Sequence, residues 1–325
     1  MGLVAITDHV FPNLEQEREL LTAAGHELRF GDNAATPDEV ARAIEGADAV
    51  LNCYAKIPAD VTREMSGCRI IARYGIGLDT IDVPVATEMG IIVTNVPDYC
   101  IDEVSDHALA LMLALARGVV RLDRRVHGGA WSPMDAAPLH RLRGRTLGLV
   151  GFGRIARTFA AKASALGLRV VASDPFLADG DITAAGAQPM DLVELLSSSH
   201  VVSLHAPLTD DTHHLMSDEQ FAAMPTGSAI VNTSRGGLVD LDALRRSLAS
   251  GHLGGAALDV LDVEPIPSDD PLLTMPNVIV TPHAGFYSEE SVAELQRKAV
   301  EQVIECLSGS VPRYAVNARE LGLAT

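Results

Sequence analysis

The stretch TLGLVGFGRIA, which runs from Thr146 to Ala156, decides the fold of this chain. Its first five residues carry no charge, as expected of a strand that is buried on both faces of a parallel sheet. Gly151 then permits a tight turn, Gly153 lets the backbone approach a ligand closely, and Ala156 lets the next helix pack against the strand. The stretch therefore predicts a strand, a turn and a helix N-terminus whose N–H groups and dipole favour phosphate.

An acidic residue at the end of the next predicted strand supports a more specific prediction for this turn, namely a dinucleotide site. Asp174 follows Gly151 at about the 20-residue spacing of a carboxylate that binds ribose hydroxyls. Such a carboxylate repels a 2′-phosphate, and Pro175 rather than a basic residue comes next. The alternative is an ordinary glycine turn beside a capping aspartate. The strand before the turn and the helix after it favour a dinucleotide site, and we expect NAD in preference to NADP.

Strand-like and helix-like patterns alternate outward from this motif along the whole chain, which indicates βαβ units and parallel sheets. One series of predicted strands lies near residues 3–6, 49–51, 69–72 and 91–94. A second series, near residues 146–150, 169–173, 200–204, 228–232, 255–258 and 277–280, makes a complete doubly wound domain. A helix over residues 102–126, apolar on almost every face, joins the two series, and an amphipathic helix over 288–307 follows them.

The predicted fold class is therefore α/β, with two Rossmann-like or flavodoxin-like doubly wound parallel-sheet domains and a cleft between them. We expect residues 101–287 to form the NAD-binding domain. Residues 1–100 and 288–325 form a discontinuous substrate-binding domain in this prediction, because the C-terminal helix adds no further sheet and packs back on the first series.

Composition and charge exclude several classes of partner. The 325 residues carry a formal net charge of −18, which argues against nucleic acid and anionic membranes. The apolar run 108–116 is too short to cross a bilayer. Four cysteines show neither a disulfide framework nor a metal-ligand spacing, so we expect no metal and a reducing, cytoplasmic setting.

Three charged residues follow three separate predicted strands of the second series, where open α/β sheets bind their ligands. Reduction of a ketone needs a proton at oxygen, which His283 can supply because imidazole titrates near neutral pH. Glu264 can orient the imidazole and favour its protonated form, and Arg235 can hold a carboxylate with its planar fork. Each residue alone has an ordinary alternative, as a packed histidine, a turn arginine or a solvated glutamate. Their occurrence together beside a dinucleotide turn predicts a catalytic set.

The blocks around these residues are NTSRGG at 232–237, LDV at 258–260 with Glu264-Pro265, and TPHAG at 281–285. Together with the 151–156 turn and Asp174, they resemble the signature blocks of the D-isomer-specific 2-hydroxyacid dehydrogenase family. Within that family the chain looks most like the bacterial enzymes grouped with the C-terminal-binding proteins. This resemblance implies hydride transfer between NAD(H) and carbon 2 of a small 2-hydroxy or 2-keto acid.

The resemblance also implies which residues bind the ligands. The implied cofactor contacts are Gly151, Gly153, Arg154, Ile155, Asp174, Ala206, Pro207, Thr233, Ser234, Arg235, Asp259, His283 and Gly285. The implied substrate contacts are Tyr54, Lys56, Tyr74, Gly75, Ile76, Gly77, Arg235 and Phe286. Two residues depart from the group: Phe286 stands where Trp is common, and Lys56 stands where an uncharged residue is common.

Three expectations remain to be tested. Local positive charge at Lys56 or Arg73 suggests a substrate with a second anionic group, such as phosphate, phosphonate or carboxylate, and the alternative is a solvated surface lysine. The apolar 102–126 helix and Trp131 suggest a homodimer. An NAD(H)-sensing, corepressor-like binding protein of the same fold is the alternative to an enzyme.

Overall fold

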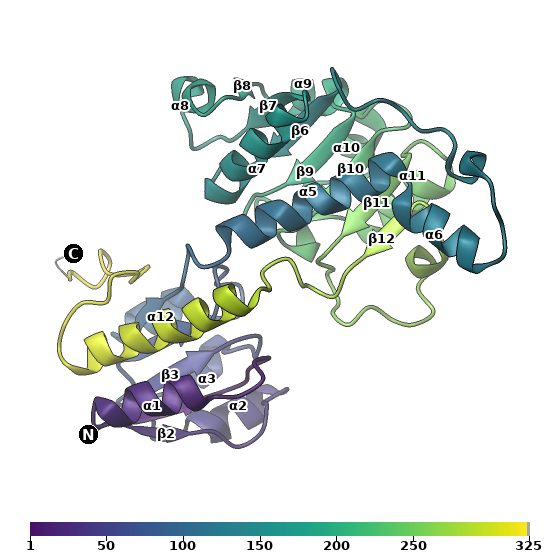
Figure 1. Ribbon diagram of the computed structural model, residues 1–325. Coiled ribbons are helices and arrows are strands. Elements are labelled where there is room, and N and C mark those ends of the chain that lie inside the picture. Colours follow the sequence, from purple (N-terminus) through teal and green to yellow (C-terminus); the bar gives the residue numbers. More distant parts are fainter. Residues whose placement is uncertain (324–325) are drawn as a thin grey trace. The chain divides into compact units, whose positions relative to one another are not determined.

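The computed structural model describes residues 1–323, and the chain divides into two compact units (Figure 1). Unit 1 joins Met1–Cys100 to Tyr287–Thr325, and unit 2 is Ile101–Phe286. Unit 2 is therefore inserted between two parts of unit 1, and the chain passes from one unit to the other at residues 100–101 and again at 286–287.

Unit 2 contains a parallel sheet of seven strands in the order β12-β11-β10-β9-β6-β7-β8. The strands are β6 (Thr146–Val150), β7 (Arg169–Ser173), β8 (Gln188–Pro189), β9 (Val201–Leu204), β10 (Ala229–Asn232), β11 (Gly255–Leu258) and β12 (Val278–Val280). The order reverses where β6 and β9 lie side by side. In a doubly wound sheet this reversal opens a crevice beyond the carboxyl ends of the strands, and ligands bind there.

Helices cover both faces of this sheet. They are α5 (Ile101–Arg117), α6 (Val119–His127), α7 (Arg154–Ala165), α8 (Asp179–Ala184), α9 (Leu192–Ser198), α10 (Asp218–Ala223) and α11 (Leu241–Ala249), with short 3-10 helices at Pro133–Ala136, Gly236–Leu238 and Pro271–Thr274. One apolar core joins the sheet to α5 and α7 through residues such as Met112 and Phe159. A second core, with Phe221 and Leu244, joins it to α9, α10 and α11.

The single helix expected over residues 102–126 is wrong. The chain breaks at Gly118, whose φ of 61° is left-handed, and α5 and α6 are two helices. A side chain at 118 would also collide with Ala136, because a Cβ there would lie 2.7 Å from the Ala136 Cβ. The apolar pattern continues across the break, so periodicity alone did not reveal it.

Unit 1 contains a parallel sheet of five strands in the flavodoxin-like order β2-β1-β3-β4-β5. The strands are β1 (Leu3–Ile6), β2 (Glu27–Arg29), β3 (Ala49–Asn52), β4 (Ile70–Arg73) and β5 (Ile92–Thr94), and the helices are α1 (Glu15–Ala23), α2 (Pro37–Ile44), α3 (Ala59–Glu64), α4 (Val83–Glu88) and α12 (Glu289–Leu307). The prediction of two doubly wound parallel sheets is confirmed.

The C-terminal helix α12 packs on the first hundred residues, as its amphipathic pattern predicts. It lies against α1, β3 and β4, and Arg69 donates hydrogen bonds to the last carbonyls of the helix, at Cys306 (2.6 Å) and Leu307 (3.1 Å). Asn317 then bonds the backbone of Ile91 and Val93, at 2.9 Å in each case. These contacts fasten the C-terminal segment to the edge of the unit 1 sheet.

Candidate active site

The glycine turn after β6 has the shape that the sequence predicts. Gly151 has a φ of 84°, and a Cβ there would lie 2.7 Å from the backbone N of Ala206, so no other residue fits without displacing the backbone. Gly153 is the N-cap of α7, no side chain caps the helix, and nothing lies within 4 Å of a Cβ at this position. The first turn of α7 therefore offers N–H groups and open space to an anion.

Asp174 lies half-buried just beyond β7 and faces this turn. Its two carboxylate oxygens accept hydrogen bonds from the backbone N of Phe152 (2.8 Å) and Phe176 (3.0 Å). These bonds fix the carboxylate, and each oxygen keeps a further lone pair for a ligand hydroxyl. A fixed carboxylate of this kind can accept hydrogen bonds from both hydroxyls of a ribose.

The loops after β9 and β10 lie at the same carboxyl edge of the unit 2 sheet as the glycine turn. The Ser234 hydroxyl donates to the carbonyl of Ala206 at 2.6 Å, which joins the two loops. Thr233 is 9% exposed, and its Oγ1 has no hydrogen-bond partner among residues 1–323. A buried hydroxyl without a partner is costly unless a ligand satisfies it. Together with the open turn and Asp174, this hydroxyl shows that the residues present fit a dinucleotide.

His283 and Glu264 form a direct pair at the carboxyl ends of β11 and β12. His283 Nδ1 lies 2.9 Å from Glu264 Oε2, and the backbone N of Leu261 donates to Glu264 Oε1 at 2.8 Å. Burial alone would raise the pKa of Glu264, but the bonds from His283 and Leu261 outweigh it, and the pKa is lowered. The carboxylate is therefore ionised at neutral pH, and it can orient the imidazole and stabilise its protonated form.

Arg235 stands directly after β10, at the same edge. Its loop is shaped by Asn232, whose side chain accepts from the Ser234 N (3.0 Å) and donates to the Arg235 carbonyl (2.8 Å). Gly236 must be glycine, because a Cβ there would lie 1.9 Å from the carbonyl carbon of Leu261. This close approach packs the Arg235 loop against the segment that leads to Glu264.

The backbone of His283 is held in an uncommon conformation by Asp259. His283 has a φ of 54°, and its N–H donates to the Asp259 carbonyl at 2.8 Å. The Asp259 side chain is 2% exposed. It accepts from the backbone N of Ala284 (2.9 Å) and Gly285 (2.8 Å). The three N–H groups thus converge on one residue, as in an anion-binding nest.

Two residues of this network were missed by the sequence analysis. The Thr281 hydroxyl donates to Asp259 Oδ1 at 2.5 Å, and His107 Nε2 lies 3.0 Å from that hydroxyl and 3.2 Å from Asp259 Oδ1. No distinct sequence signal marks His107, because it follows Ser105 and Asp106 in the polar first part of α5.

Another histidine of the same unit, His205, differs from His283. Burial lowers the pKa of His205, which follows β9, to about 4, so this imidazole is neutral across the physiological range. Its ring packs beside Phe159 and lies 2.9 Å from the Ser203 hydroxyl. His205 is therefore unsuited to donate a proton near neutral pH.

In unit 1, the loop after β4 presents backbone amides rather than the side chain of Tyr74. Tyr74 is 2% exposed, and its hydroxyl donates to buried Glu17 at 3.1 Å. The expectation that Tyr74 binds substrate is thus limited to its backbone. The carbonyls of Gly75 and Ile76 are held by Val96 N and by the Asn95 side chain.

The amides of this loop are available to a ligand. Within residues 1–323, the N–H groups of Ile76 and Gly77 donate to no protein acceptor. Gly75 has a φ of 142°, which L side chains rarely adopt, and the Arg73 guanidinium occupies the place that a Cβ would take. Arg73 is 6% exposed, and its Nε has no partner in the described part of the chain. A buried cation beside open N–H groups suits an anionic ligand.

The remaining expected substrate residues lie in two places. Tyr54 (37% exposed) and Lys56 (exposed) follow β3, the strand next to β4, so both stand at the same edge as Gly75. Asp8 holds this segment by accepting from the backbone N of Tyr54 and Ala55, at 2.6 and 3.0 Å. Phe286 belongs to unit 2, where its ring centroid lies 6.4 Å from that of His283.

None of the helices in the described part of the chain has the length and apolar character that a membrane crossing needs. Within residues 1–323, no group of three or more His, Cys, Asp or Glu side chains is arranged to hold a metal ion.

The sequence of this chain is similar to a known family and to several named relatives. Residues 109–285 match the family model described as the NAD-binding domain of the D-isomer-specific 2-hydroxyacid dehydrogenases. The chain is 38% identical over 309 residues to a glyoxylate reductase of Korarchaeum cryptofilum, with 93% of each chain covered. It is also 38% identical over 301 residues to a hydroxypyruvate reductase of Thermotoga maritima, covering 91% of this chain and 95% of the relative.

A solved structure shares the whole architecture. The D-lactate dehydrogenase of Aquifex aeolicus, complexed with NAD and lactic acid, superposes with a TM-score of 0.85 at 27% identity over 95% of this chain and 96% of that one. The fold, the matched family model and the extent of the sequence similarity lead to one conclusion. The chain belongs to the D-isomer-specific 2-hydroxyacid dehydrogenase family.

Proposed function

We propose that the chain reduces a small 2-keto acid to the corresponding 2-hydroxy acid with NADH, and catalyses the reverse reaction with NAD. The observation that carries this proposal is the His283–Glu264 pair with Arg235, at the edge of the sheet that also bears the dinucleotide turn. The glyoxylate and hydroxypyruvate reductases to which the chain is similar act, by name, on acids of this class.

Each residue has one task in this reaction. The bound nicotinamide supplies or accepts the hydride. His283 has its Nδ1 on Glu264, so Nε2 is the atom that gives a proton to the carbonyl oxygen and takes it back in the reverse direction. Arg235 binds the substrate carboxylate through two parallel N–H bonds and polarises the carbonyl. The unit 1 loop of Gly75, Ile76 and Gly77 binds an anionic group of the substrate through its amides.

The remaining predicted residues are assigned to the cofactor. In this proposal the turn and the first residues of α7 bind the pyrophosphate and Asp174 binds the adenosine ribose, whereas the loops after β9, β10 and β12 enclose the nicotinamide half. The cofactor residues are Gly151, Gly153, Arg154, Ile155, Asp174, Ala206, Pro207, Thr233, Ser234, Arg235, Asp259, His283 and Gly285.

The direct test follows NADH absorbance with glyoxylate, pyruvate, hydroxypyruvate, oxaloacetate and phosphonopyruvate as substrates. We expect turnover of at least one of these acids. NADH binding without turnover on the whole panel would instead support a dinucleotide sensor. No feature of residues 1–323 favours that alternative, and the relatives named above are enzymes.

A second anionic group on the substrate is the finer part of the proposal. Lys56 is exposed at the edge that bears Arg73 and the loop amides, and in the described residues it makes no ion pair. With Lys56→Ala, we expect KM to rise for oxaloacetate and phosphonopyruvate but not for glyoxylate. Equal KM values for the variant and the wild type across monoanions and dianions would make Lys56 a solvated surface residue.

The pH dependence of the reduction should change in Glu264→Gln. The lowered pKa of Glu264 means that its negative charge is present at neutral pH and is lost only as the pH falls through that value. Below that pH a protonated Glu264 no longer holds the imidazole as a carboxylate. In the wild type kcat for reduction should therefore fall as the pH falls through the lowered pKa of Glu264, and this acid limb should be lost in Glu264→Gln, as measured from pH 4 to 9. A limb that stays in place would contradict the pairing role of Glu264.

Discrimination between NADH and NADPH should depend on Asp174. Asp174→Ser removes the carboxylate that repels a 2′-phosphate and binds ribose hydroxyls. Loss of charge-assisted hydrogen bonds worth about 1.5–3 kcal/mol should raise the KM for NADH by roughly 10-fold or more. The KM for NADPH should fall. Asp179→Ser, an exposed acid at the start of α8, is the matched control. A wild type that prefers NADPH would overturn the assignment.

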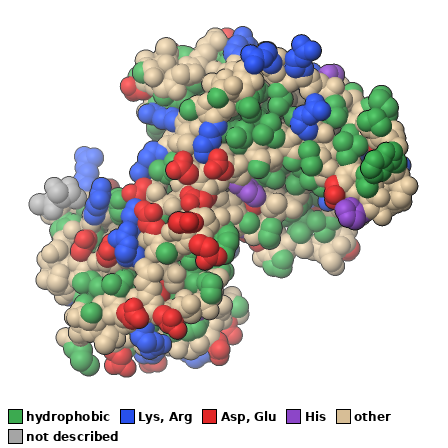
Figure 2. Space-filling model, in the orientation of Figure 1, with side chains coloured by type: hydrophobic (Ala, Val, Ile, Leu, Met, Phe, Trp, Pro, Cys, Tyr) green, Lys and Arg blue, Asp and Glu red, His purple; other side chains and the backbone are tan. Residues whose placement is uncertain are grey.

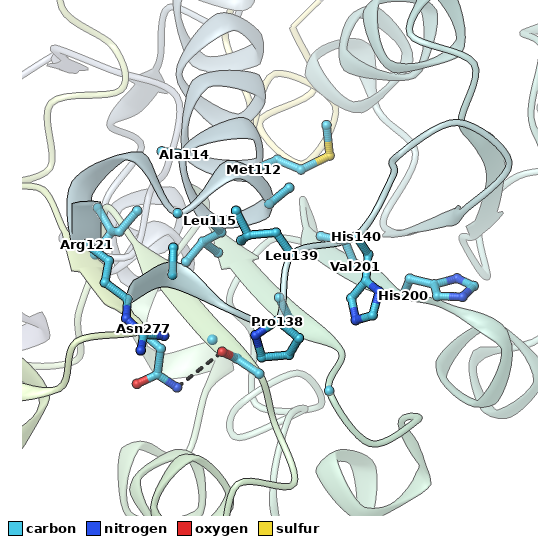
Figure 3. Close-up of a pocket in the computed structure, with 18 of the residues that line it drawn as sticks. Met112, Ala114, Leu115, Arg121, Pro138, Leu139, His140, His200, Val201 and Asn277 are labelled. Atoms are coloured by element: carbon cyan, nitrogen blue, oxygen red, sulfur yellow. Dashed lines mark hydrogen bonds between the residues drawn. The ribbon is translucent and has the colours of Figure 1, made fainter. Parts of the chain in front are cut away.

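We also propose a homodimer whose contact includes α6 and the segment after it. No residue of α6 is buried, and Val119, Val126, Trp131 and Met134 are 46–87% exposed. Figure 2 shows hydrophobic side chains on the surface in this part of unit 2. An apolar pocket of about 190 Å³ adjoins the segment at the amino ends of the strands, with Met112, Leu115 and Leu139 among its lining residues (Figure 3).

Light scattering after gel filtration tests this contact. Trp131→Asp combined with Val126→Asp should convert a dimer to a monomer, because charged groups would be buried without partners. Val193→Asp, at a 70% exposed site on α9, should leave the dimer intact. A monomeric wild type would exclude the contact.

A further inference from the structure

Both chain segments next to the unit boundary meet at one buried carboxylate in unit 2. Helix α5 begins directly after residue 100, and His107 is its seventh residue. The loop from Thr281 to Gly285 comes just before the second boundary at 286–287. His107, Thr281 and the loop amides all bond Asp259, which follows β11 and is 2% exposed.

The hydrogen bonds define which atom of His107 carries a proton. A threonine hydroxyl has one hydrogen, and Thr281 uses it on Asp259 Oδ1 at 2.5 Å. The contact of 3.0 Å between His107 Nε2 and Thr281 Oγ1 must then run from the imidazole to the hydroxyl. His107 is therefore a donor at Nε2, shared between Thr281 Oγ1 and Asp259 Oδ1.

Asp259 is ionised in this network. Burial raises its pKa, but bonds from His107, Thr281 and the amides of Ala284 and Gly285 outweigh burial, and the pKa is lowered. A buried carboxylate needs such donors to remain charged. The His107 side chain supplies one of the few donors that do not belong to the 281–285 loop itself.

The same carboxylate keeps His283 in its left-handed conformation. A φ of 54° is unfavourable for a residue other than glycine, and it persists only where its surroundings enforce it. Here the enforcing bonds are those from the backbone N of 283, 284 and 285 to Asp259. Gly285 lies close to the side chains of Asp259 and His107. A Cβ at this position would lie 2.8 Å from Asp259 Oδ2 and 3.4 Å from His107 Cδ2.

We infer that His107 is a positioning residue for hydride transfer: by donating to Thr281 and Asp259, it fixes the loop that places His283 Nε2 against the substrate carbonyl. This role rests on the proposed function, because it acts through His283. In this inference His107 acts on the reaction through Asp259 and Thr281 rather than by touching the substrate.

Three variants separate positioning from general stability. His107→Phe removes the donor, whereas His107→Gln keeps an N–H group near the place of Nε2. A catalytic group displaced by a fraction of an ångström loses about 10- to 100-fold in rate. We expect that loss of kcat for His107→Phe, with the KM for NADH within about threefold of wild type, and kcat within about threefold for His107→Gln. His252→Gln, between α11 and β11, is the control.

Thr281→Val tests the second half of the network. We expect kcat to fall by about 10-fold. The double variant His107→Phe/Thr281→Val should be no slower than the slower single variant, because the two residues act on one carboxylate. Fully multiplicative losses would show two independent roles and would overturn the inference. So would a kcat for His107→Phe within twofold of wild type, or equal impairment in His107→Gln.

Nuclear magnetic resonance with ¹⁵N-histidine decides the question without turnover. The signal lost in His107→Gln should show a tautomer protonated at Nε2, and the signal lost in His283→Gln should shift in His107→Phe but not in His252→Gln. An unshifted His283 signal would overturn the inference. If the wild type turned over no keto acid, the proposed function would fail, and these spectra would still test the positioning of His283.

Discussion

His283→Gln should reduce kcat for 2-keto acid reduction by about 10³-fold, within the 10²- to 10⁴-fold range of general acid catalysis. Glutamine can still bond Glu264, but it cannot give up a proton to a developing alkoxide. NADH binding, measured by fluorescence, should stay within about threefold of wild type, because the turn at 151–153 and Asp174 are unaffected. A kcat within 10-fold of wild type would remove His283 from the acid–base role.

The chain offers a matched control for this variant. His214 is the other histidine with a left-handed backbone, at a φ of 53°, and its ring stacks on His213 at 3.9 Å. His214→Gln makes the same substitution in the same backbone conformation, at a histidine that has no hydrogen-bonded carboxylate within residues 1–323. We expect kcat close to wild type for this variant. A large loss in both variants would point to backbone strain rather than to proton transfer.

Arg235→Gln should reduce kcat/KM by roughly 10²- to 10³-fold. Two charge-assisted hydrogen bonds to a carboxylate are worth about 3–4 kcal/mol together, and each 1.36 kcal/mol is a factor of ten. Arg235→Lys should recover part of the loss, because lysine keeps the charge but not the planar fork. The loss should lie mainly in KM for the keto acid and in kcat, with less effect on the KM for NADH.

The comparison variant for Arg235 is Arg246→Gln. Arg246 lies on α11 and pairs with Asp218 at the surface, at 2.7 Å, and surface pairs contribute little to stability. Its removal should leave kcat/KM within about twofold of wild type. If Arg235→Gln retained kcat/KM within threefold on every acid of the panel, the substrate carboxylate would have to bind elsewhere.

The features that could be predicted from sequence are those that depend on neighbours in the chain. The turn at Gly151 was recognisable because strand, glycines and helix follow one another directly. Arg235, Glu264 and His283 were recognisable because each stands just after a strand, and parallel strands bring their carboxyl ends to one edge. Because parallel strands end at one edge, the sequence also predicted that Glu264 pairs with His283. It did not predict the distance between the two side chains.

The features that escaped prediction have weak or distant signals. The edge strands β2 and β8 are three and two residues long, too short to show a period. Glu17 lies on a helix where an acid is usually solvated, yet it is fully buried and bonds Tyr74 and Gln296. His107 lies 174 residues before its partner Thr281. Contacts of that separation depend on tertiary packing, which no local pattern encodes.

The insertion of unit 2 within unit 1 sets an order for folding during synthesis on the ribosome. Unit 2 leaves the ribosome as one continuous stretch and can fold as soon as its last residue emerges. The sheet of unit 1 lacks α12 until residues 289–307 have been synthesised, which takes on the order of ten to forty seconds after residue 100 at about 5–20 residues per second. Until then Glu17 has no Gln296, and the helix that lies against β3 and β4 is missing. During that time residues 1–100 expose the surface of α1, β3 and β4 that α12 later covers.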